Sequence, residues 1–300
     1  MTSERYLEIE SKGGLIDLSS RGKFRLTGGD RVRYLNGQVT NDVRLATETR
    51  AIYACVTDIK GRTVGDVFIR AAENGTALYL DVVSELREVL GPRLERYMIA
   101  DDVELTDITE EWQLWHVFGP AAECISEGVE AERFGCTGRD VWLPRDADEP
   151  SWEAPILTTS EAEQWRILRG IPQFPQELGG EVFPPEAGLD DRAMSYTKGC
   201  YIGQEILSRI RTTGKMPRRL VQWSSNDSEL GISPGDELVQ PGESIKVGLV
   251  TSVTLDPNTG RQVGLAYLKS SAVVVDSELL VGGGEPRIEH RVKISPLVNQ

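Results

Sequence analysis

Short runs in which apolar and polar residues alternate recur through the first 145 residues. Four of them have the period of two and the β-branched and aromatic content of strands: GKFRLTG at 22–28, RAIYACVTD at 50–58, GDVFIRAA at 65–72 and TALYLDV at 76–82. After them, SELREVLGPRLERYMIADDVEL at 84–105 spaces its large apolar residues mostly three or four positions apart, which predicts one or two amphipathic helices. Strands and helices therefore mix in this region, as in an α+β fold.

The middle of the chain predicts connections and two short helices. PRDADEPSWEAPILTTSEA at 144–162 is acidic and contains proline, which favours a surface connection between two lobes. SEAEQWRILRGIP at 160–172 predicts a helix that ends near Gly170. QFPQELGGEVFPPEAGLDD at 173–191 predicts a long irregular loop, and such loops inside a domain are usually functional. KGCYIGQEILSRIR at 198–211 then predicts a second helix, with Cys200 just before it or on its first turn.

Beyond Pro217 the pattern changes to short strands separated by turn signals such as SPGD, QPGE and DPNTG. This spacing is typical of a small β-barrel or sandwich. We therefore expect an α+β protein with a two-lobed domain at residues 1–215 and a small C-terminal β-barrel domain at 216–300. Its predicted strands are RRLVQWSS (218–225), DELVQ (236–240), IKVGLVTSVTL (245–255), RQVGLAYLK (261–269), AVVVD (272–276) and RIEHRVKI (287–294).

Composition limits the compartment and the metal chemistry. Apolar residues make up 39% of the chain and charged residues 27%, no run is long enough to cross a bilayer, and MTSERYLEIES lacks the order of a secretory signal. We therefore expect a cytoplasmic protein with no membrane segment. The four cysteines form no C-x-x-C pair and the chain has two histidines, so we predict free thiols and neither a zinc site nor a disulfide framework.

Charge argues against general nucleic-acid binding. The formal charge is −14, whereas proteins that bind phosphate backbones usually present a basic face, so direct nucleic-acid binding is not expected. Residues 198–219 are an exception, with six basic residues against Glu205 alone. This stretch fits a small polyanion or one segment of a nucleic acid, and equally a solvated helix face.

Known catalytic motifs are scarce. The chain has no G-x-S-x-G elbow, no G-x-G-x-x-G and no G-x-x-x-x-G-K-[ST], which excludes the common nucleophile, dinucleotide and P-loop signatures. Four carboxylates lie in or beside turns and loops, where a carboxylate can bind the amino-pyrimidine edge of a pterin through two hydrogen bonds. They are Asp58, Asp66, Glu177 and Glu186, and for each of them a solvated or capping role is the alternative.

The octapeptide KGCYIGQE is the most distinctive stretch. It consists of Lys198, Gly199, Cys200, Tyr201, Ile202, Gly203, Gln204 and Glu205. A thiol at a helix N-terminus with a lysine two residues earlier has two reasons for a lowered pKa, and its thiolate is then a nucleophile or a soft-metal ligand. The glycines would let a ligand approach the backbone, and Gln204 and Glu205 add hydrogen-bonding groups. The alternative is a small buried cysteine that only packs.

KGCYIGQE resembles the signature K-G-C-Y-x-G-Q-E of the YgfZ-type folate-binding proteins, which are relatives of the aminomethyltransferase (T-protein) of the glycine cleavage system. Further blocks are similar to the family and in family order: DRVRYLNGQVTNDV (30–43), YACVTDIKGRTVGDVFI (53–69), RILRGIPQFPQELGGEVFPPEAGLD (166–190), and KVGLVTSV with VGLAYLK (246–269). The resemblance spans most of the chain.

The resemblance implies a two-lobed folate domain followed by a small β-barrel, with tetrahydrofolate or a one-carbon derivative as cofactor. Asp66 falls where aminomethyltransferases have an aspartate pair, and Gly65 replaces the other member. Glu177 falls at the place of a glutamate that faces the pterin, and Tyr53 and Tyr201 match aromatic residues of the family blocks. Basic residues after the motif would meet the anionic glutamyl tail of folate.

The function implied is that of a tetrahydrofolate-binding accessory protein. It would support assembly or repair of iron-sulfur client enzymes, and indirectly tRNA modification, with Cys200 as soft ligand, nucleophile or redox thiol. The alternative is a folate-dependent aminomethyltransferase or amine demethylase in which Asp66 orients or deprotonates an amine, so catalytic residues would be Cys200 or Asp66. A third interpretation is an RNA-associated module that uses the basic stretch.

Overall fold

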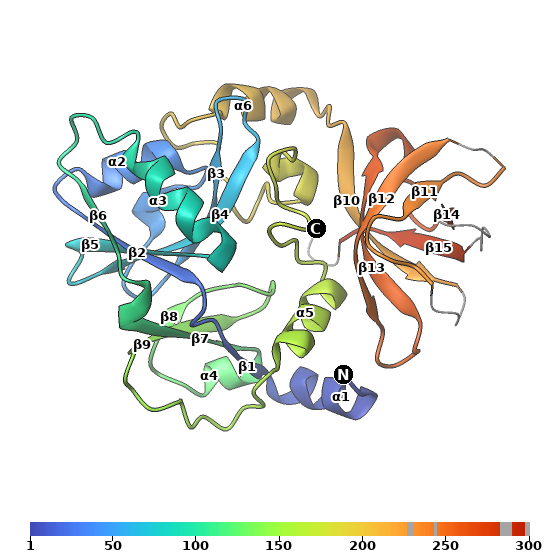
Figure 1. The fold of residues 1–300 in the computed structure, drawn as a ribbon, viewed down its shortest axis with the longest axis horizontal. Coiled ribbons are helices and arrows are strands. Elements are labelled where there is room, and N and C mark those ends of the chain that lie inside the picture. Colours follow the sequence, from blue (N-terminus) through green and yellow to red (C-terminus); the bar gives the residue numbers. More distant parts are fainter. Residues whose placement is uncertain (227–230, 243–244, 283–289, 298–300) are drawn as a thin grey trace.

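Two β-sheets with flanking helices and a closed β-barrel surround a common centre (Figure 1). The structure is a computed structural model that describes residues 1–226, 231–242, 245–282 and 290–297. Five 3-10 turns are placed in it: η1 (Val43–Leu45), η2 (Ser84–Leu86), η3 (Thr109–Glu111), η4 (Pro184–Ala187) and η5 (Ser270–Ala272).

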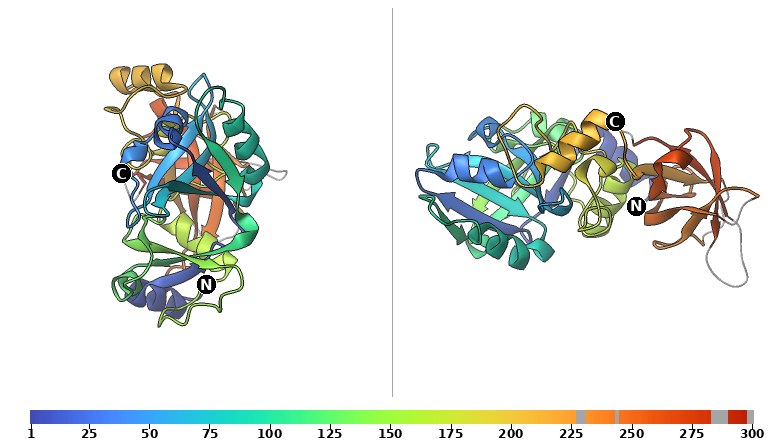
Figure 2. Two further views of the ribbon diagram at one scale, coloured as in Figure 1. Left: turned by 90° about the vertical axis from the view of Figure 1, so that its left-hand side faces the viewer. Right: turned by 90° about the horizontal axis from the view of Figure 1, so that it is seen from above.

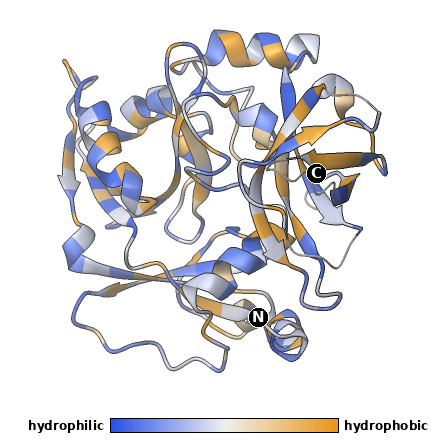
Figure 3. Ribbon diagram, turned by 45° about the vertical axis from the view of Figure 1, so that its right-hand side comes forward, coloured by the Kyte–Doolittle hydropathy of each residue, from blue (hydrophilic) through white to orange (hydrophobic). Residues whose placement is uncertain are grey.

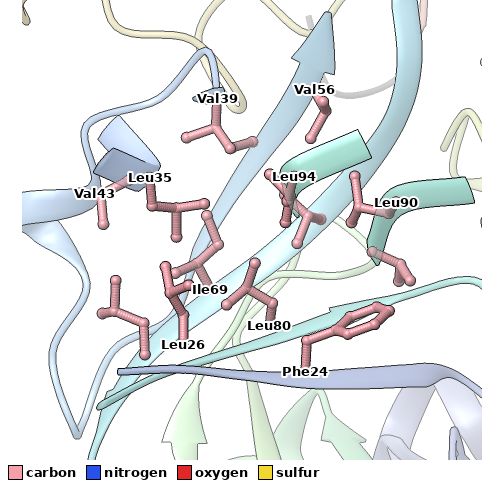
Figure 4. Close-up of a cluster of buried hydrophobic side chains, with 14 of the residues drawn as sticks. Phe24, Leu26, Leu35, Val39, Val43, Val56, Ile69, Leu80, Leu90 and Leu94 are labelled. Carbon is pink, nitrogen blue, oxygen red and sulfur yellow. The ribbon is translucent and has the colours of Figure 1, made fainter. Parts of the chain in front are cut away.

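The first lobe is an antiparallel sheet with the strand order β3, β4, β5, β2, β6. Its strands are β2 (Gly22–Thr27), β3 (Ile52–Thr57), β4 (Thr63–Ala72), β5 (Ala77–Val82) and β6 (Glu104–Asp107). Apolar residues of α2 (Arg31–Gln38) and α3 (Arg87–Glu95) pack on this sheet, as Figure 4 shows for Leu35, Leu90 and Leu94 opposite Ile69 and Leu80. The four strands predicted before residue 83 are confirmed. The helical prediction at 84–105 is confirmed for 84–95, which form η2 and α3, but it is wrong beyond Glu95, where residues 96–103 form turns and bends and the last two residues belong to β6.

The second lobe is an antiparallel sheet with the order β1, β7, β9, β8. Its elements are α1 (Ser3–Lys12), β1 (Gly14–Asp17), β7 (Trp112–Phe118), α4 (Pro120–Glu123), β8 (Val129–Glu130) and β9 (Gly138–Pro144). The connection predicted from residue 144 is irregular until α5 (Thr159–Leu168) begins. The N-terminus of α5 is a capping box, since the Thr158 side chain accepts from the Glu161 N–H and Glu161 accepts from the Thr158 N–H.

The C-terminal strands close into a barrel in the order β10, β13, β12, β11, β14, β15. They are β10 (Arg218–Ser225), β11 (Glu237–Val239), β12 (Lys246–Leu255), β13 (Gln262–Lys269), β14 (Glu278–Gly282) and β15 (His290–Ser295). Figure 3 shows hydrophobic and hydrophilic residues interleaved along these strands, as closure around an apolar core requires. The predicted α+β architecture with a C-terminal barrel is confirmed.

One barrel prediction is wrong and one strand was missed. Residues 272–276 form the end of η5 and a turn instead of a strand, with Val274 and Val275 more than half exposed. β14 begins at Glu278 instead. Of the strand predicted at 287–294, residues 287–289 lie outside the described residues and the remainder lies in β15.

The helix α6 (Gln204–Thr213) runs from the first lobe toward the barrel, and the chain then enters β10 (Figures 1 and 2). The domain boundary predicted after residue 215 falls between α6 and β10. The division of the chain into two domains stays a prediction. Within the part of the chain that the structure describes, no helix has the length and apolar content needed to cross a membrane. All four cysteines are free thiols.

Candidate functional site

A cavity of about 100 Å³ lies where the two sheets meet the segment that follows α5. We call it the central cavity. Its walls combine aromatic rings from β3, β4 and the second lobe with arginine side chains and the carboxylate of Asp66. The arginines are Arg21, Arg133, Arg166 and Arg192, and the rings are Tyr53, Phe68 and Phe134. Apolar surfaces for a flat ring and a few directed polar groups are thus present together, as small-molecule sites require.

A larger trough of about 530 Å³ adjoins the central cavity. Tyr53, Phe68 and Arg192 line both. The trough carries three arginines, Arg50, Arg192 and Arg211, together with the carboxylates of Glu130, Glu132, Asp190 and Asp191. Its volume lies within the range of ligand pockets, and its polarity suits a ligand with charged groups at one end.

Asp66 is buried with one oxygen unpaired. It lies on β4 opposite Cys55 of β3, and its Oδ2 accepts a hydrogen bond from the Tyr53 hydroxyl at 3.1 Å. Its Oδ1 is buried and has no partner among the described residues. Burial raises the pKa of Asp66 above its ordinary value, although the nearby Arg21 cation and the Tyr53 hydrogen bond oppose the shift. A buried acceptor without a donor is costly, so this oxygen is suited to receive a hydrogen bond from a ligand.

A buried ionic network holds the cavity walls together. Arg133 donates to Asp81 of β5 at 2.8 Å and to both oxygens of Asp140 of β9 at 2.9 and 2.7 Å, so it joins the two sheets. Its guanidinium lies 3.9 Å from the centre of the Phe68 ring, which in turn stacks on Tyr53 at 4.7 Å. Arg133 therefore fixes the aromatic pair beside Asp66.

His116 completes this network from β7. Its Nδ1 lies 2.8 Å from Asp140, and the side chain is fully buried. Burial lowers the pKa of His116 despite the carboxylate beside it. A neutral imidazole that donates from Nδ1 to Asp140 follows from this environment.

Glu177 lies behind the cavity wall. Its carboxylate accepts from Arg166 at 3.0 Å and from the hydroxyl of Ser252 in β12 at 2.5 Å, and the Gln173 N–H also donates to it at 3.1 Å. Glu177 is not among the described residues that line the central cavity. The predicted contact of Glu177 with a pterin stays a prediction; in this structure the carboxylate positions Arg166, which does line the cavity.

Two other candidate carboxylates have local roles. The Asp58 side chain accepts from the N–H groups of Lys60 and Arg62 and so stabilises the β3–β4 turn. Glu186 accepts from the Phe183 N–H at the start of η4 and from Arg218 at 3.2 Å. The capping alternative fits both residues. In the described ranges, no group of three or more His, Cys, Asp or Glu side chains is arranged to hold a metal ion.

The octapeptide motif lies outside both cavities. Cys200 is exposed and precedes Gln204, the first residue of α6, so the interpretation of a buried packing cysteine does not fit. The Lys198 ammonium, expected beside the thiol, is buried and donates to three backbone carbonyls.

The other motif residues are mainly structural in this position. Tyr201 is buried in an apolar cluster with Leu207 and Ile210, and its hydroxyl has no partner among the described residues. Burial raises the pKa of Tyr201 to about 12. Gly203 has φ +86° and packs against the β3–β4 turn, whereas Gly199 borders open space. Gln204 and Glu205 begin α6.

The basic stretch is only partly available to an anion. Lys198 is buried and Arg218 is paired with Glu186. Arg211 of α6 lines the trough and lies 3.9 Å over the Tyr196 ring, which also lines it. The remaining basic residues of the stretch are exposed but are not among the described residues that line the trough: Arg209, Lys215 and Arg219. The expectation that this stretch meets an anionic tail therefore rests on Arg211.

Several site residues were missed by sequence reasoning. Arg21, Arg133 and Arg192 line the central cavity, and Asp81 and Asp140 hold Arg133 in place. Their positions in the chain are far apart, and no local spacing relates them. Phe68 lay in a quoted family block, but its role depends on the stacking with Tyr53 that only the sheet register reveals.

Comparison with known proteins gives consistent results. A family model described as the GCVT N-terminal domain matches residues 2–134. The aminomethyltransferase of Rubrobacter xylanophilus is 30% identical over 293 residues, which cover 87% of this chain and 77% of that protein. The aminomethyltransferase of Shouchella clausii is 28% identical over an alignment of 327 residues, covering 96% and 87%.

A solved structure shares the fold. The crystal structure of the glycine cleavage system aminomethyltransferase T from Bartonella henselae superposes with a TM-score of 0.82 at 15% sequence identity, covering 96% of this chain and 86% of that one. The two sheets and the C-terminal barrel described above are thus the arrangement of that structure.

Proposed function

The chain belongs to the aminomethyltransferase family, and on this premise we propose that it binds tetrahydrofolate or a one-carbon derivative, with the pterin in the central cavity. The unpaired, buried Oδ1 of Asp66 is the observation that carries the proposal. A pterin offers ring and amino N–H donors to such an oxygen, and Tyr53 and Phe68 offer apolar ring faces beside it.

The adjoining trough extends this proposal to the rest of the cofactor. The benzoylglutamate part of folate ends in carboxylates, and Arg192 and Arg211 of α6 both line the trough. Bound folate supplies ring nitrogens that accept or carry a one-carbon unit. The residues of this chain would bind the ring, keep its polar edge against Asp66 and exclude water with the Tyr53–Phe68 pair.

Replacement of Asp66 by asparagine is expected to weaken tetrahydrofolate binding about tenfold to a hundredfold, because the charged acceptor is lost and an amide takes its place. Anaerobic isothermal titration measures the dissociation constant. Asp58→Asn is the matched control, since Asp58 only stabilises a turn, and it should bind like the wild type. Equal affinity of Asp66→Asn and the wild type would contradict the placement of the ring.

The pH dependence gives a second readout of the same contact. Burial raises the pKa of Asp66 above 3.8, so the carboxylate becomes protonated at higher pH than an exposed aspartate. On acidification, affinity for tetrahydrofolate should therefore begin to fall at a higher pH than the pH at which an exposed aspartate is protonated. Asp66→Asn should lack this fall in affinity.

A second function is favoured by the exposed thiol. Cys200 is exposed, while its neighbours Lys198 and Tyr201 are buried, so the chain presents this sulfur on a fixed segment. We propose that the protein belongs to the YgfZ-type subgroup that KGCYIGQE resembles, acts in the cytoplasm, and uses Cys200 in the assembly or repair of iron-sulfur enzymes, with indirect effects on tRNA modification. Gly65, in place of a second acidic residue, agrees with a departure from glycine cleavage.

Cys200→Ala separates the two roles. We expect its affinity for tetrahydrofolate to stay within about twofold of the wild type, because Cys200 lines neither cavity, and we expect cells that depend on it to lose activity of iron-sulfur enzymes. Cys124→Ala, at another exposed thiol, should have no effect in cells. Should Cys200→Ala support those enzymes fully while Asp66→Asn stops turnover of an aminomethyl donor, a folate-dependent one-carbon transferase is the correct function.

A further inference from the structure

Lys198 is a buried cation that donates hydrogen bonds to backbone oxygens. Its Nζ donates to the carbonyls of Asn36, Val39 and Asn41 at 2.6, 2.7 and 2.7 Å. These carbonyls lie in the last turn of α2 and just beyond it, where helix carbonyls have no partner within the helix and carry partial negative charge. Lys198 thus donates hydrogen bonds to the carbonyls at the C-terminal end of α2, although it lies far from α2 in the sequence.

The segment that Lys198 holds also forms a wall of the trough. Asn41 lines the trough, and its amide donates to the carbonyl of Tyr53 at 2.8 Å. The Thr40 hydroxyl donates to the carbonyl of Ala193 at 2.6 Å, next to Arg192, which lines the trough and the central cavity. Residues 36–41 therefore contact Lys198 on one side and the cavity walls on the other.

The same segment also supports the motif. The Ile202 N–H donates to the carbonyl of Gly37 at 3.1 Å, and the Thr57 hydroxyl of β3 donates to the carbonyl of Ile202 at 2.6 Å. Cys200 lies between these contacts at Ile202 and the anchored Lys198.

We infer that Lys198 is a positioning residue that fixes both the Asn41 wall of the trough and the exposed thiol of Cys200. The inference rests on the proposed function, because it takes the trough as part of the folate site. In this role Lys198 connects the two sites through backbone contacts, whereas its spacing in the sequence had indicated a direct effect of its charge on the thiol.

The charge state of Lys198 offers a specific test. Three carbonyls require three N–H donors, which the ammonium has and the neutral amine lacks. Burial lowers the pKa of Lys198 to about 7, with the Asp42 carboxylate opposing the shift and the Arg44 guanidinium adding to it; the uncharged Tyr201 ring lies 5.0 Å away. Above this pH one of the three contacts loses its donor.

The experiment compares Lys198→Met with Lys215→Met, the matched control at an exposed lysine of the same basic stretch. Tetrahydrofolate affinity is measured by anaerobic titration. The alkylation rate of Cys200 by iodoacetamide is measured by mass spectrometry, with exposed Cys124 of the same molecule as internal reference. Lys198→Arg, which keeps a charged donor, is the second variant should Lys198→Met fail to fold.

Lys198→Met is expected to weaken tetrahydrofolate binding about tenfold and to change the ratio of Cys200 to Cys124 alkylation at least about threefold, while Lys215→Met changes neither. In Lys198→Arg both changes should be smaller. A cooperatively folded Lys198→Met with wild-type affinity and ratio would overturn the inference, and so would a change in only one of the two quantities.

The pH profile separates positioning from general loosening. In the wild type the alkylation ratio should show an inflection near pH 7 that Lys198→Met lacks. Equal profiles in both proteins would contradict the role of Lys198. If the wild type does not bind tetrahydrofolate, the proposed function fails, while the alkylation ratio and its pH profile still decide whether Lys198 positions Cys200.

Discussion

Arg133→Met is expected to lower the free energy of unfolding by about 3–5 kcal/mol, because it removes the partner of buried carboxylates. Asp140 is almost completely buried, and Arg133 supplies two of its hydrogen bonds; the other comes from His116. Among the described residues, the Asp81 carboxylate would keep its pairing with Arg21 alone. Urea unfolding followed by fluorescence measures the loss.

The experiment must show that the loss of stability comes from the unpaired charge on Asp140. Arg133→Met combined with Asp140→Asn removes cation and carboxylate together, and this double variant should be more stable than Arg133→Met alone. Arg139→Met is the control at a half-buried arginine that donates to the Gly128 carbonyl at 3.3 Å, and it should cost less than about 1 kcal/mol. Equal stabilities of the single and double variants would show that packing, and not the buried charge, accounts for the loss.

The free energy of unfolding that Arg133→Met loses should depend on pH, and the direction of this dependence can be predicted. Burial alone would raise the pKa of Asp140, but Arg133 and His116 hold it below its ordinary value in the folded protein. The ionised carboxylate therefore adds stability above its unfolded pKa, and this contribution is lost on acidification. Without Arg133 the buried Asp140 takes up a proton more readily, so the difference between Arg133→Met and the wild type should shrink as the pH falls.

The parts of the site that could be predicted from the sequence are those that depend on local spacing. Tyr53 and Asp66 lie on the two strands of one hairpin, so the quoted block 53–69 already placed them together. Arg133 could not be found in this way, because its partners Asp81 and Asp140 belong to different sheets and their approach depends on how the lobes pack. Long-range pairing of this kind has no periodic signal in the chain.

Two other differences between the sequence-based expectation and the structure have local physical reasons. AVVVD was predicted as a strand from its β-branched content, but Asp276 has φ +64° and the preceding valines face solvent, so the stretch turns into β14. Lys198 was predicted to lie beside Cys200 from their spacing of two residues. A lysine side chain is long enough to turn inward, and the carbonyls at and just beyond the end of α2 accept three hydrogen bonds from its ammonium.

Gly203→Ala is expected to destabilise the protein by about 2–5 kcal/mol, from the sum of a left-handed backbone that costs roughly 1–2 kcal/mol in a residue with a Cβ and an overpacking cost of about 1–3 kcal/mol. Gly203 has φ +86°, and an added Cβ would lie 2.5 Å from the carbonyl oxygen of Asp58 and 2.8 Å from the Cα of Gly61. Both atoms belong to backbone, which cannot move aside as a flexible side chain can.

The same motif contains the control for this prediction. Gly199 has no atom within 4 Å of the position of an added Cβ and no left-handed φ, so Gly199→Ala should change the free energy of unfolding by less than about 0.5 kcal/mol. Thermal and urea unfolding of the two variants test the difference directly. A large loss in Gly199→Ala would mean that both motif glycines are needed for another reason, whereas a loss confined to Gly203→Ala means that Gly203 lets the segment carrying Cys200 pack against the β3–β4 turn, which leads into the strand that carries Asp66.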